Sequence, residues 1–149
     1  KDELSISLGF NKIYFLTTQA TASASEALIN GMKPYMEVNI IGGTTYGKPV
    51  GMYSFTDNNN EYAFLPVCFK LENADGEADY YGGLAPDPEA ELADDFKQPF
   101  GSLEDDLLYQ ALYHIENGSY DIRKARGVLK TMPENQIEYR SLQDEIGAL

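Results

Sequence analysis

A serine with small neighbours stands at the start of a predicted helix, in the run Thr21-Ala22-Ser23-Ala24-Ser25-Glu26. Small side chains on both sides of Ser23 would let the backbone of a substrate approach its hydroxyl. At a helix N-terminus, free N–H groups and the helix dipole also favour a developing oxyanion. The same run fits a capping box, with Glu26 three residues after the cap, and the local sequence alone favours capping.

A lysine follows a glycine-rich loop in the run Gly42-Gly43-Thr44-Thr45-Tyr46-Gly47-Lys48-Pro49. This run matches the first seven positions of a phosphate-binding P-loop, after a predicted strand. A P-loop needs Ser or Thr after the lysine to hold magnesium, and a helix must begin there. Pro49 has no hydroxyl, and an extended strand is predicted instead. Nucleotide binding is therefore disfavoured, and a structural turn is the alternative to a chemical role for Lys48.

The elements that would position these two residues alternate between strand and helix. Short apolar runs predict strands at Lys12–Thr17 and 38–41. Helical spacing of apolar residues predicts a helix over 25–35, with Pro34 near its end. Two more strands, 50–56 and 61–71, are predicted on either side of a turn. This order indicates a mixed α/β chain.

The C-terminal part of the chain is predicted to be helical. The clearest helix covers 102–117, where Ser102 and Asp105 resemble a capping box and Gly118 ends the helix. Weaker helical patterns follow at 122–130 and 137–146. His114 borders the apolar face of the helix predicted at 102–117. This position favours a packing role for His114 over a role as the base for Ser23.

Length and composition bound the function. The 149 residues suit one domain, and 43% hydrophobic residues can build its core. With 11 basic and 24 acidic residues the net charge is -13, which argues against nucleic-acid binding. A single cysteine and a single histidine exclude an intrachain disulfide, a cysteine-based zinc site and any scheme needing two imidazoles. Cys68 lies in an apolar run and is predicted to be a core thiol.

Acidic residues gather in one segment. Residues 72–106 carry 12 of the 24 acids and only one base. Asp75, Glu77 and Asp79 alternate as calcium ligands do, but Pro86 occupies the position of the bidentate glutamate of an EF-hand loop. A solvated acidic face is the favoured interpretation, and neither a metal nor a cofactor is expected.

Taken together, Ser23 and Lys48 lie 25 residues apart, linked by helix, strand and loop. This arrangement resembles the C-terminal-processing (tail-specific) serine peptidases, which use a Ser/Lys dyad. The resemblance runs through residues 12–52, and the run Gly82-Gly83-Leu84-Ala85-Pro86-Asp87 resembles the family's Gly-Ile-x-Pro-Asp segment. It implies that Ser23 is the nucleophile and Lys48 the general base, with the Ala24 N–H as oxyanion donor and Glu26 as supporting residue.

A Ser/Lys dyad makes its own chemical demand. The serine must lose its proton to a base, and lysine is a base only when neutral. Its ordinary pKa of about 10.4 must fall toward roughly 7–8 through burial or a nearby cation. The apolar neighbours Tyr46, Val50 and Met52 are expected to supply dry surroundings. Ser23 would then attack a peptide carbonyl and form an acyl-enzyme that water hydrolyses.

The resemblance also implies a fold and a cellular setting. The expected fold is α/β, a ClpP/crotonase-like mixed sheet with helices, in which residues 1–98 form part of the catalytic core and 99–149 a helical C-terminal extension. Expected partners are protein or peptide substrates, the upstream half of the catalytic domain and, through an open strand edge at 13–17 or 38–41, further copies of the chain. The family's setting implies the cell envelope, as a periplasmic protein or lipoprotein.

Two departures from the family's pattern keep a second interpretation open. Many members carry Gln where this chain has Met52, and nothing before Ile13 resembles their upstream Asp-x-Arg-x-Asn-x-Gly-Gly motif. The peptide-binding PDZ module of many members is also not found. The alternative is a non-catalytic peptide-binding or scaffolding module that retains the peptidase fold.

Overall fold

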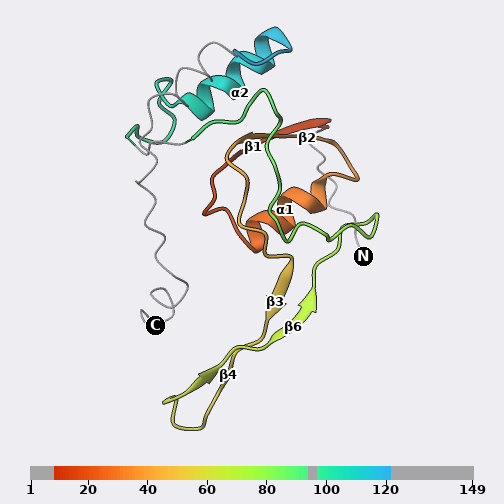
Figure 1. Cartoon of the computed structure of the whole chain (residues 1–149), viewed down its shortest axis with the longest axis vertical. Helices are drawn as coiled ribbons and strands as arrows, with labels where there is room; N and C mark the ends of the chain where they lie inside the picture. Colours follow the sequence, from red (N-terminus) through yellow and green to blue (C-terminus); the bar gives the residue numbers. More distant parts are fainter. Residues whose placement is uncertain (1–8, 94–96, 122–149) are drawn as a thin grey trace.

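Two parallel strands and the helix that connects them form the centre of the fold (Figure 1). The computed structural model describes residues 9–93 and 97–121. Strand β1 (Lys12–Thr17) pairs in parallel with β2 (Glu37–Gly42), from Lys12 opposite Glu37 to Thr17 opposite Gly42. Both strands come from the apolar runs in the sequence, as expected for parallel strands that are covered on their faces. The fold is α/β.

The two outer edges of this strand pair differ. Residues 87–92 run along the free edge of β2, where the N–H groups of Asp87 and Leu92 donate to Ile40 and Gly42, and Gly42 donates to Ala90. Along β1, no described residue pairs with the outer edge. β1 therefore presents the open edge of the sheet.

Helix α1 (Ala24–Met32) crosses between the two strands and packs through its apolar side. Ile29, which is 1% exposed, joins Ile40, Tyr80 and Leu84 in one core cluster. The helix was predicted to reach residue 35 but ends at Met32, because Pro34 cannot donate the backbone hydrogen bond that would continue it.

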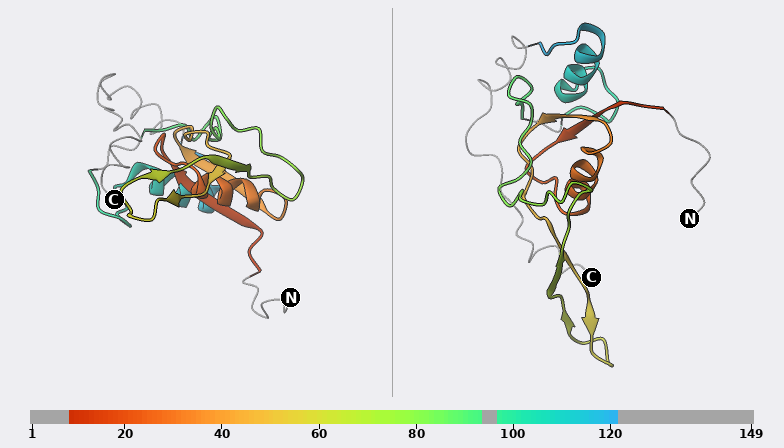
Figure 2. Two further views of the ribbon diagram at one scale, coloured as in Figure 1. Left: turned by 90° about the horizontal axis from the view of Figure 1, so that it is seen from below. Right: turned by 90° about the vertical axis from the view of Figure 1, so that its right-hand side faces the viewer.

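A two-stranded arm, residues 50–70, extends away from this centre in Figure 1 and in the right-hand view of Figure 2. Its base pairs β3 (Val50–Met52) with β6 (Val67–Lys70), and its tip pairs β4 (Phe55–Thr56) with β5 (Ala63–Phe64). Each predicted long strand is thus split in two. A bulge at Gly51/Met52 and the missing N–H of Pro66 interrupt the ladder.

Helix α2 (Asp106–Asn117) packs on the strands with Leu107 and Ala111, which join Ile41, Ala90 and Leu92 in a second core cluster. The predicted capping box is wrong in register: Asp105 is the N-cap and accepts from the Leu108 N–H at 2.9 Å, while Ser102 accepts from Glu104 in the preceding turn. Gly118, at φ 68°, ends the helix as predicted. The helices predicted at 122–130 and 137–146 lie outside the described residues.

None of the helices in residues 9–93 and 97–121 combines the length and the apolar character that a bilayer span requires. Within the same ranges, no group of acidic, histidine or cysteine side chains is arranged to hold a metal ion. In the acidic segment, Asp79 instead forms an ion pair with Lys70 at 2.9 Å, and Glu77 accepts from Asn73.

Candidate active site

Ser23 adopts a backbone conformation that serine rarely takes. It is the N-cap of α1, at φ 54° and ψ −112°. The only other non-glycine residue with positive φ in the described chain is Asn60, a type that tolerates this region. Such strain costs of the order of 1–3 kcal/mol and persists where surrounding contacts enforce it, often at functional sites. A sharp, strained turn into a helix also presents nucleophilic serines in other hydrolase folds.

Glu26 supplies the contacts that hold this turn. Its side chain is fully buried in the first turn of α1. Among the described residues its carboxylate accepts four hydrogen bonds, which come from the Ser23 N–H (2.9 Å), the Thr45 hydroxyl (2.6 Å), the Gly47 N–H (2.6 Å) and the Lys48 N–H (2.8 Å). A capping role for Glu26 is therefore confirmed, and the same carboxylate also reaches the glycine-rich loop.

These bonds bring the two predicted motifs together. The backbone nitrogens of Ser23 and Lys48 both donate to the same atom, Oε2 of Glu26, so they lie no further apart than the sum of those two hydrogen-bond lengths. The Tyr46 N–H adds a bond to the Thr21 carbonyl oxygen at 2.9 Å. The loop that carries Lys48 is thus fixed against the turn that carries Ser23.

The loop conformation depends on glycine at one position. Gly47 has φ 92°, and a Cβ there would collide with the Tyr81 carbonyl and the Gly83 nitrogen. The Gly47-Lys48 pair of the sequence therefore has a steric reason: only glycine lets the loop pass this close to the neighbouring segment while it bonds to Glu26.

The third motif, residues 82–87, closes the network. The Leu84 N–H donates to the Thr45 hydroxyl at 2.7 Å, and the Thr45 N–H donates to the Leu84 carbonyl at 3.1 Å. Thr45 therefore connects Glu26 to a segment almost 40 positions further along the chain. Sequence reasoning missed Thr45, because a threonine in a glycine-rich loop carries no distinguishing signal.

The polar cluster borders a dry core. The Tyr80 hydroxyl is buried and has no hydrogen-bond partner among the described residues. Burial, with a smaller contribution from the charge of Glu26, raises the pKa of Tyr80. Because the Glu26 side chain is itself fully buried, the hydrogen bonds that it accepts lie in a low-dielectric environment that strengthens them.

The oxyanion donor predicted from the resemblance has a suitable place. Ala24 is the first residue of α1, and within the described residues no acceptor takes its N–H. The first N–H groups of a helix lack partners within the helix and lie at the positive end of its dipole. Ala24 is exposed, so this N–H can reach a bound carbonyl oxygen.

The surroundings predicted for Lys48 are only partly present. Lys48, Val50 and Met52 are half-buried, but the Tyr46 side chain is 50% exposed. Tyr46 is fixed through its backbone N–H, and half of its surface remains open to solvent. The described residues alone therefore give Lys48 partial desolvation.

The remaining candidates lie elsewhere. The His114 Nδ1 is hydrogen-bonded to the Tyr14 hydroxyl at 2.8 Å, and its ring stacks on Tyr120 with centroids 4.3 Å apart. His114 therefore ties α2 to β1, which agrees with the predicted packing role. The prediction that Cys68 is a core thiol is wrong: it is exposed, because a two-stranded arm has nothing to bury it.

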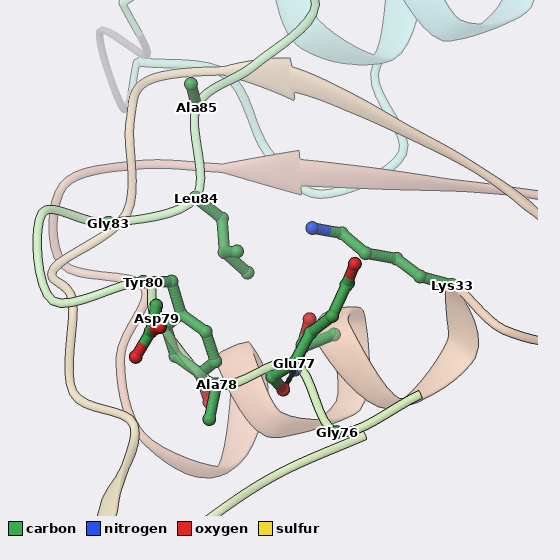
Figure 3. A pocket seen from close by; sticks show the side chains of 10 residues that line it. Lys33, Gly76, Glu77, Ala78, Asp79, Tyr80, Gly83, Leu84 and Ala85 are labelled. Carbon is green, nitrogen blue, oxygen red and sulfur yellow. Dashed lines mark hydrogen bonds between the residues drawn. The ribbon is translucent and has the colours of Figure 1, made fainter. Parts of the chain in front are cut away.

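A cavity of about 520 Å³ opens beside the C-terminal half of α1 (Figure 3). Its lining comes from Asn30 and Lys33 at that end of the helix and from residues 76–80 and 83–85. Neither Ser23 nor Lys48 lines it. The cavity therefore does not include the two predicted catalytic residues, although Leu84, which lines it, also bonds to Thr45 of the Glu26 network.

Comparison with known proteins identifies the family. The profile of peptidase family S41 matches residues 9–90, which include Ser23, Glu26, Lys48 and the third motif. The chain belongs to this family. Among curated proteins, none matches the chain significantly.

A solved structure agrees with this assignment. The crystal structure of a protein from Bacteroides fragilis assigned to the S41 proteases is similar to this chain, with a TM-score of 0.67 and 32% sequence identity. The similarity covers 73% of this chain and 28% of the Bacteroides chain. The chain thus spans little more than a quarter of the length of this relative.

Proposed function

We propose that this chain carries the nucleophile and the general base of a serine endopeptidase of the C-terminal-processing (tail-specific) type. One observation carries the proposal: the buried Glu26 accepts, at a single oxygen, the N–H groups of both Ser23 and Lys48. The strained backbone of Ser23 and membership of peptidase family S41 support it. The substrates proposed are proteins or peptides cleaved near their C-termini.

In the proposed mechanism, the neutral Lys48 amine takes the proton of the Ser23 hydroxyl as the serine oxygen attacks a peptide carbonyl. The carbonyl oxygen gains a negative charge, to which the Ala24 N–H donates. Collapse of this intermediate breaks the C–N bond, and Lys48 returns its proton to the leaving amine. Water, deprotonated by the same lysine, then hydrolyses the acyl-enzyme.

Glu26 acts in this mechanism as a positioning residue. The proposed role of its carboxylate is structural: its hydrogen bonds keep Ser23 in its strained turn and hold the loop of Lys48 against that turn. Further desolvation of Lys48, which the mechanism needs, is assigned to the upstream half of the catalytic domain.

The proposal extends to architecture and setting. We propose that residues 1–98 belong to a ClpP/crotonase-like catalytic core and residues 99–149 to a C-terminal extension; of that extension the structure describes residues 99–121, which include α2. The upstream half adds strands at the outer edge of β1. From the usual location of the family we propose the cell envelope as the setting of the parent protein, as a periplasmic protein or lipoprotein.

A non-catalytic peptide-binding or scaffolding module is the second candidate. Met52 favours it, because many family members place a glutamine there. Ser23 and Lys48 oppose it, because a module that only binds has no use for a strained serine beside a lysine loop.

Substitutions at the two serines of the motif separate these candidates. The completed protein is this chain together with the proposed upstream half of the catalytic domain. In it, Ser23→Ala is expected to lower the rate of hydrolysis of an unfolded protein substrate by at least about 10²–10⁴-fold. Combining it with Lys48→Arg should lower the rate scarcely further, because the two groups act as one unit. Ser25→Ala, on the exposed first turn of α1, is the matched control and should retain activity. Loss of activity in Ser25→Ala alone would move the nucleophile to Ser25.

The open edge of β1 predicts self-association of the isolated chain. Unpaired strand edges pair with one another, so sedimentation velocity should show a species larger than one chain, increasing with concentration. Leu16→Lys, which places a charge on β1, should weaken this association, whereas Leu28→Lys, at a similarly exposed position of α1, should not. A strictly monomeric wild-type chain would contradict an open edge.

A further inference from the structure

The arm at residues 50–70 carries an aromatic face that the proposed chemistry does not use. Its register places Phe69 opposite Gly51 and Phe64 opposite Phe55. Side chains alternate between the two faces of a strand, so Tyr53 lies on the same face as Gly51 and Phe55. The Tyr53 and Phe69 rings confirm this by their centroid separation of 5.5 Å.

This aromatic face is exposed along its whole length. The exposed fractions are 60% for Tyr53, 57% for Phe55, 68% for Phe64 and 40% for Phe69. Isolated exposed apolar residues are ordinary, but a contiguous exposed patch marks a surface that binds a partner. Aromatic side chains bury large areas at little entropic cost, which suits them to such contacts.

The arm also offers backbone groups to a partner. It has only two strands, and among the described residues no other segment pairs with its outer edges. An extended peptide can therefore add to an edge as a third strand. Backbone hydrogen bonds would then give affinity for any extended sequence, and the aromatic face would select apolar side chains at alternate positions.

Position and charge indicate which partner the arm fits. β3 begins two residues after Lys48, and the Leu71 N–H closes the base of the arm onto the Pro49 carbonyl at 2.8 Å. A chain bound along the arm would therefore lead to the loop of the proposed base. Residues 50–70 hold two acids and one base in a chain of net charge -13, so the arm carries little net charge and repels an acidic polypeptide less than the rest of the surface does.

We propose that the arm binds extended, apolar segments of polypeptide substrates by strand addition along its aromatic face. The description of the occupant as substrate rests on the proposed function. The binding itself does not depend on catalysis, because it uses neither Ser23 nor Lys48.

Binding is measured with the full chain carrying Ser23→Ala, which prevents turnover. The probe is a short fluorescein-labelled peptide of alternating valine and threonine. Its binding to the chain is measured by fluorescence anisotropy. The double variant Phe55→Ser/Phe64→Ser should raise the dissociation constant by about tenfold or more, because it removes two aromatic contacts. Tyr35→Ser removes an aromatic residue that is 71% exposed outside the arm and should leave the constant unchanged. A peptide methylated at alternate backbone nitrogens should lose affinity, since strand addition needs those N–H groups.

Equal affinities of the double variant and the wild-type sequence would overturn the proposal. It is also wrong if the double variant abolishes self-association and leaves peptide affinity unchanged, because the arm is then a contact between copies. Circular dichroism confirms that the double variant is folded before either comparison. The proposed function fails separately: an inactive completed protein whose arm still binds the peptide would contradict the peptidase assignment alone.

Discussion

Lys48→Arg is expected to lower the peptidase activity of the completed protein by about 10²–10⁴-fold, the usual effect of removing a positioned general base. The guanidinium keeps a positive charge but does not lose its proton in the working pH range, so it cannot accept the Ser23 proton. The backbone N–H of residue 48 remains, so its hydrogen bond to Glu26 should persist. Hydrolysis of a fluorogenic peptide under kcat/KM conditions measures the loss.

Lys33→Arg is the matched control for this substitution. Lys33 is exposed at the C-terminal end of α1, away from the turn that carries Ser23. It should retain wild-type activity. Full activity of Lys48→Arg would show that the Ser/Lys mechanism is wrong, and His114 or a histidine of the upstream half would become the base to test.

Glu26→Ala is expected to lower the free energy of unfolding of the chain by about 3–5 kcal/mol, the scale for breaking a buried charged network. The substitution leaves the N–H groups of Ser23, Gly47 and Lys48 and the Thr45 hydroxyl without their acceptor. Each buried donor without an acceptor costs about 1–3 kcal/mol. Urea unfolding followed by circular dichroism measures the change.

Two companion variants sharpen this measurement. Glu26→Gln keeps the side-chain volume but turns an amide NH₂ toward some of the donors, so its loss should be intermediate. Glu104→Ala removes an exposed carboxylate and should change the unfolding free energy by less than about 0.5 kcal/mol. A Glu26→Ala chain as stable as the wild type would show that the carboxylate does not hold the two motifs together.

The elements around the site follow from local sequence patterns. The apolar run predicted Lys12–Thr17 with the bounds of β1, and the predicted strand at 38–41 lies within β2. Short apolar runs favour strands that other elements cover on their faces. Gly118 ended α2 as predicted, because glycine takes a left-handed conformation without cost. Capping by Glu26 also followed from spacing alone.

Long-range contacts account for what the sequence did not predict. The positive φ of Ser23 is held by Glu26, whose carboxylate also accepts from Gly47, 21 positions further along the chain, and the bond from Leu84 to Thr45 joins segments with no shared periodicity. The apolar run around Cys68 predicts burial, but the run belongs to an arm that no other described segment covers, so the thiol is exposed. Local patterns thus predicted the elements, and tertiary contacts determined the site.

The central claim is that Ser23 is the nucleophile, and covalent labelling tests it most directly. The completed protein is treated with a fluorophosphonate, which forms a stable bond with an activated serine, and the modified residue is located by peptide mass spectrometry. The adduct is predicted on Ser23, unchanged in Ser25→Ala, abolished in Ser23→Ala and strongly slowed in Lys48→Arg. An adduct on another serine, or labelling that persists in Ser23→Ala, would contradict the assignment.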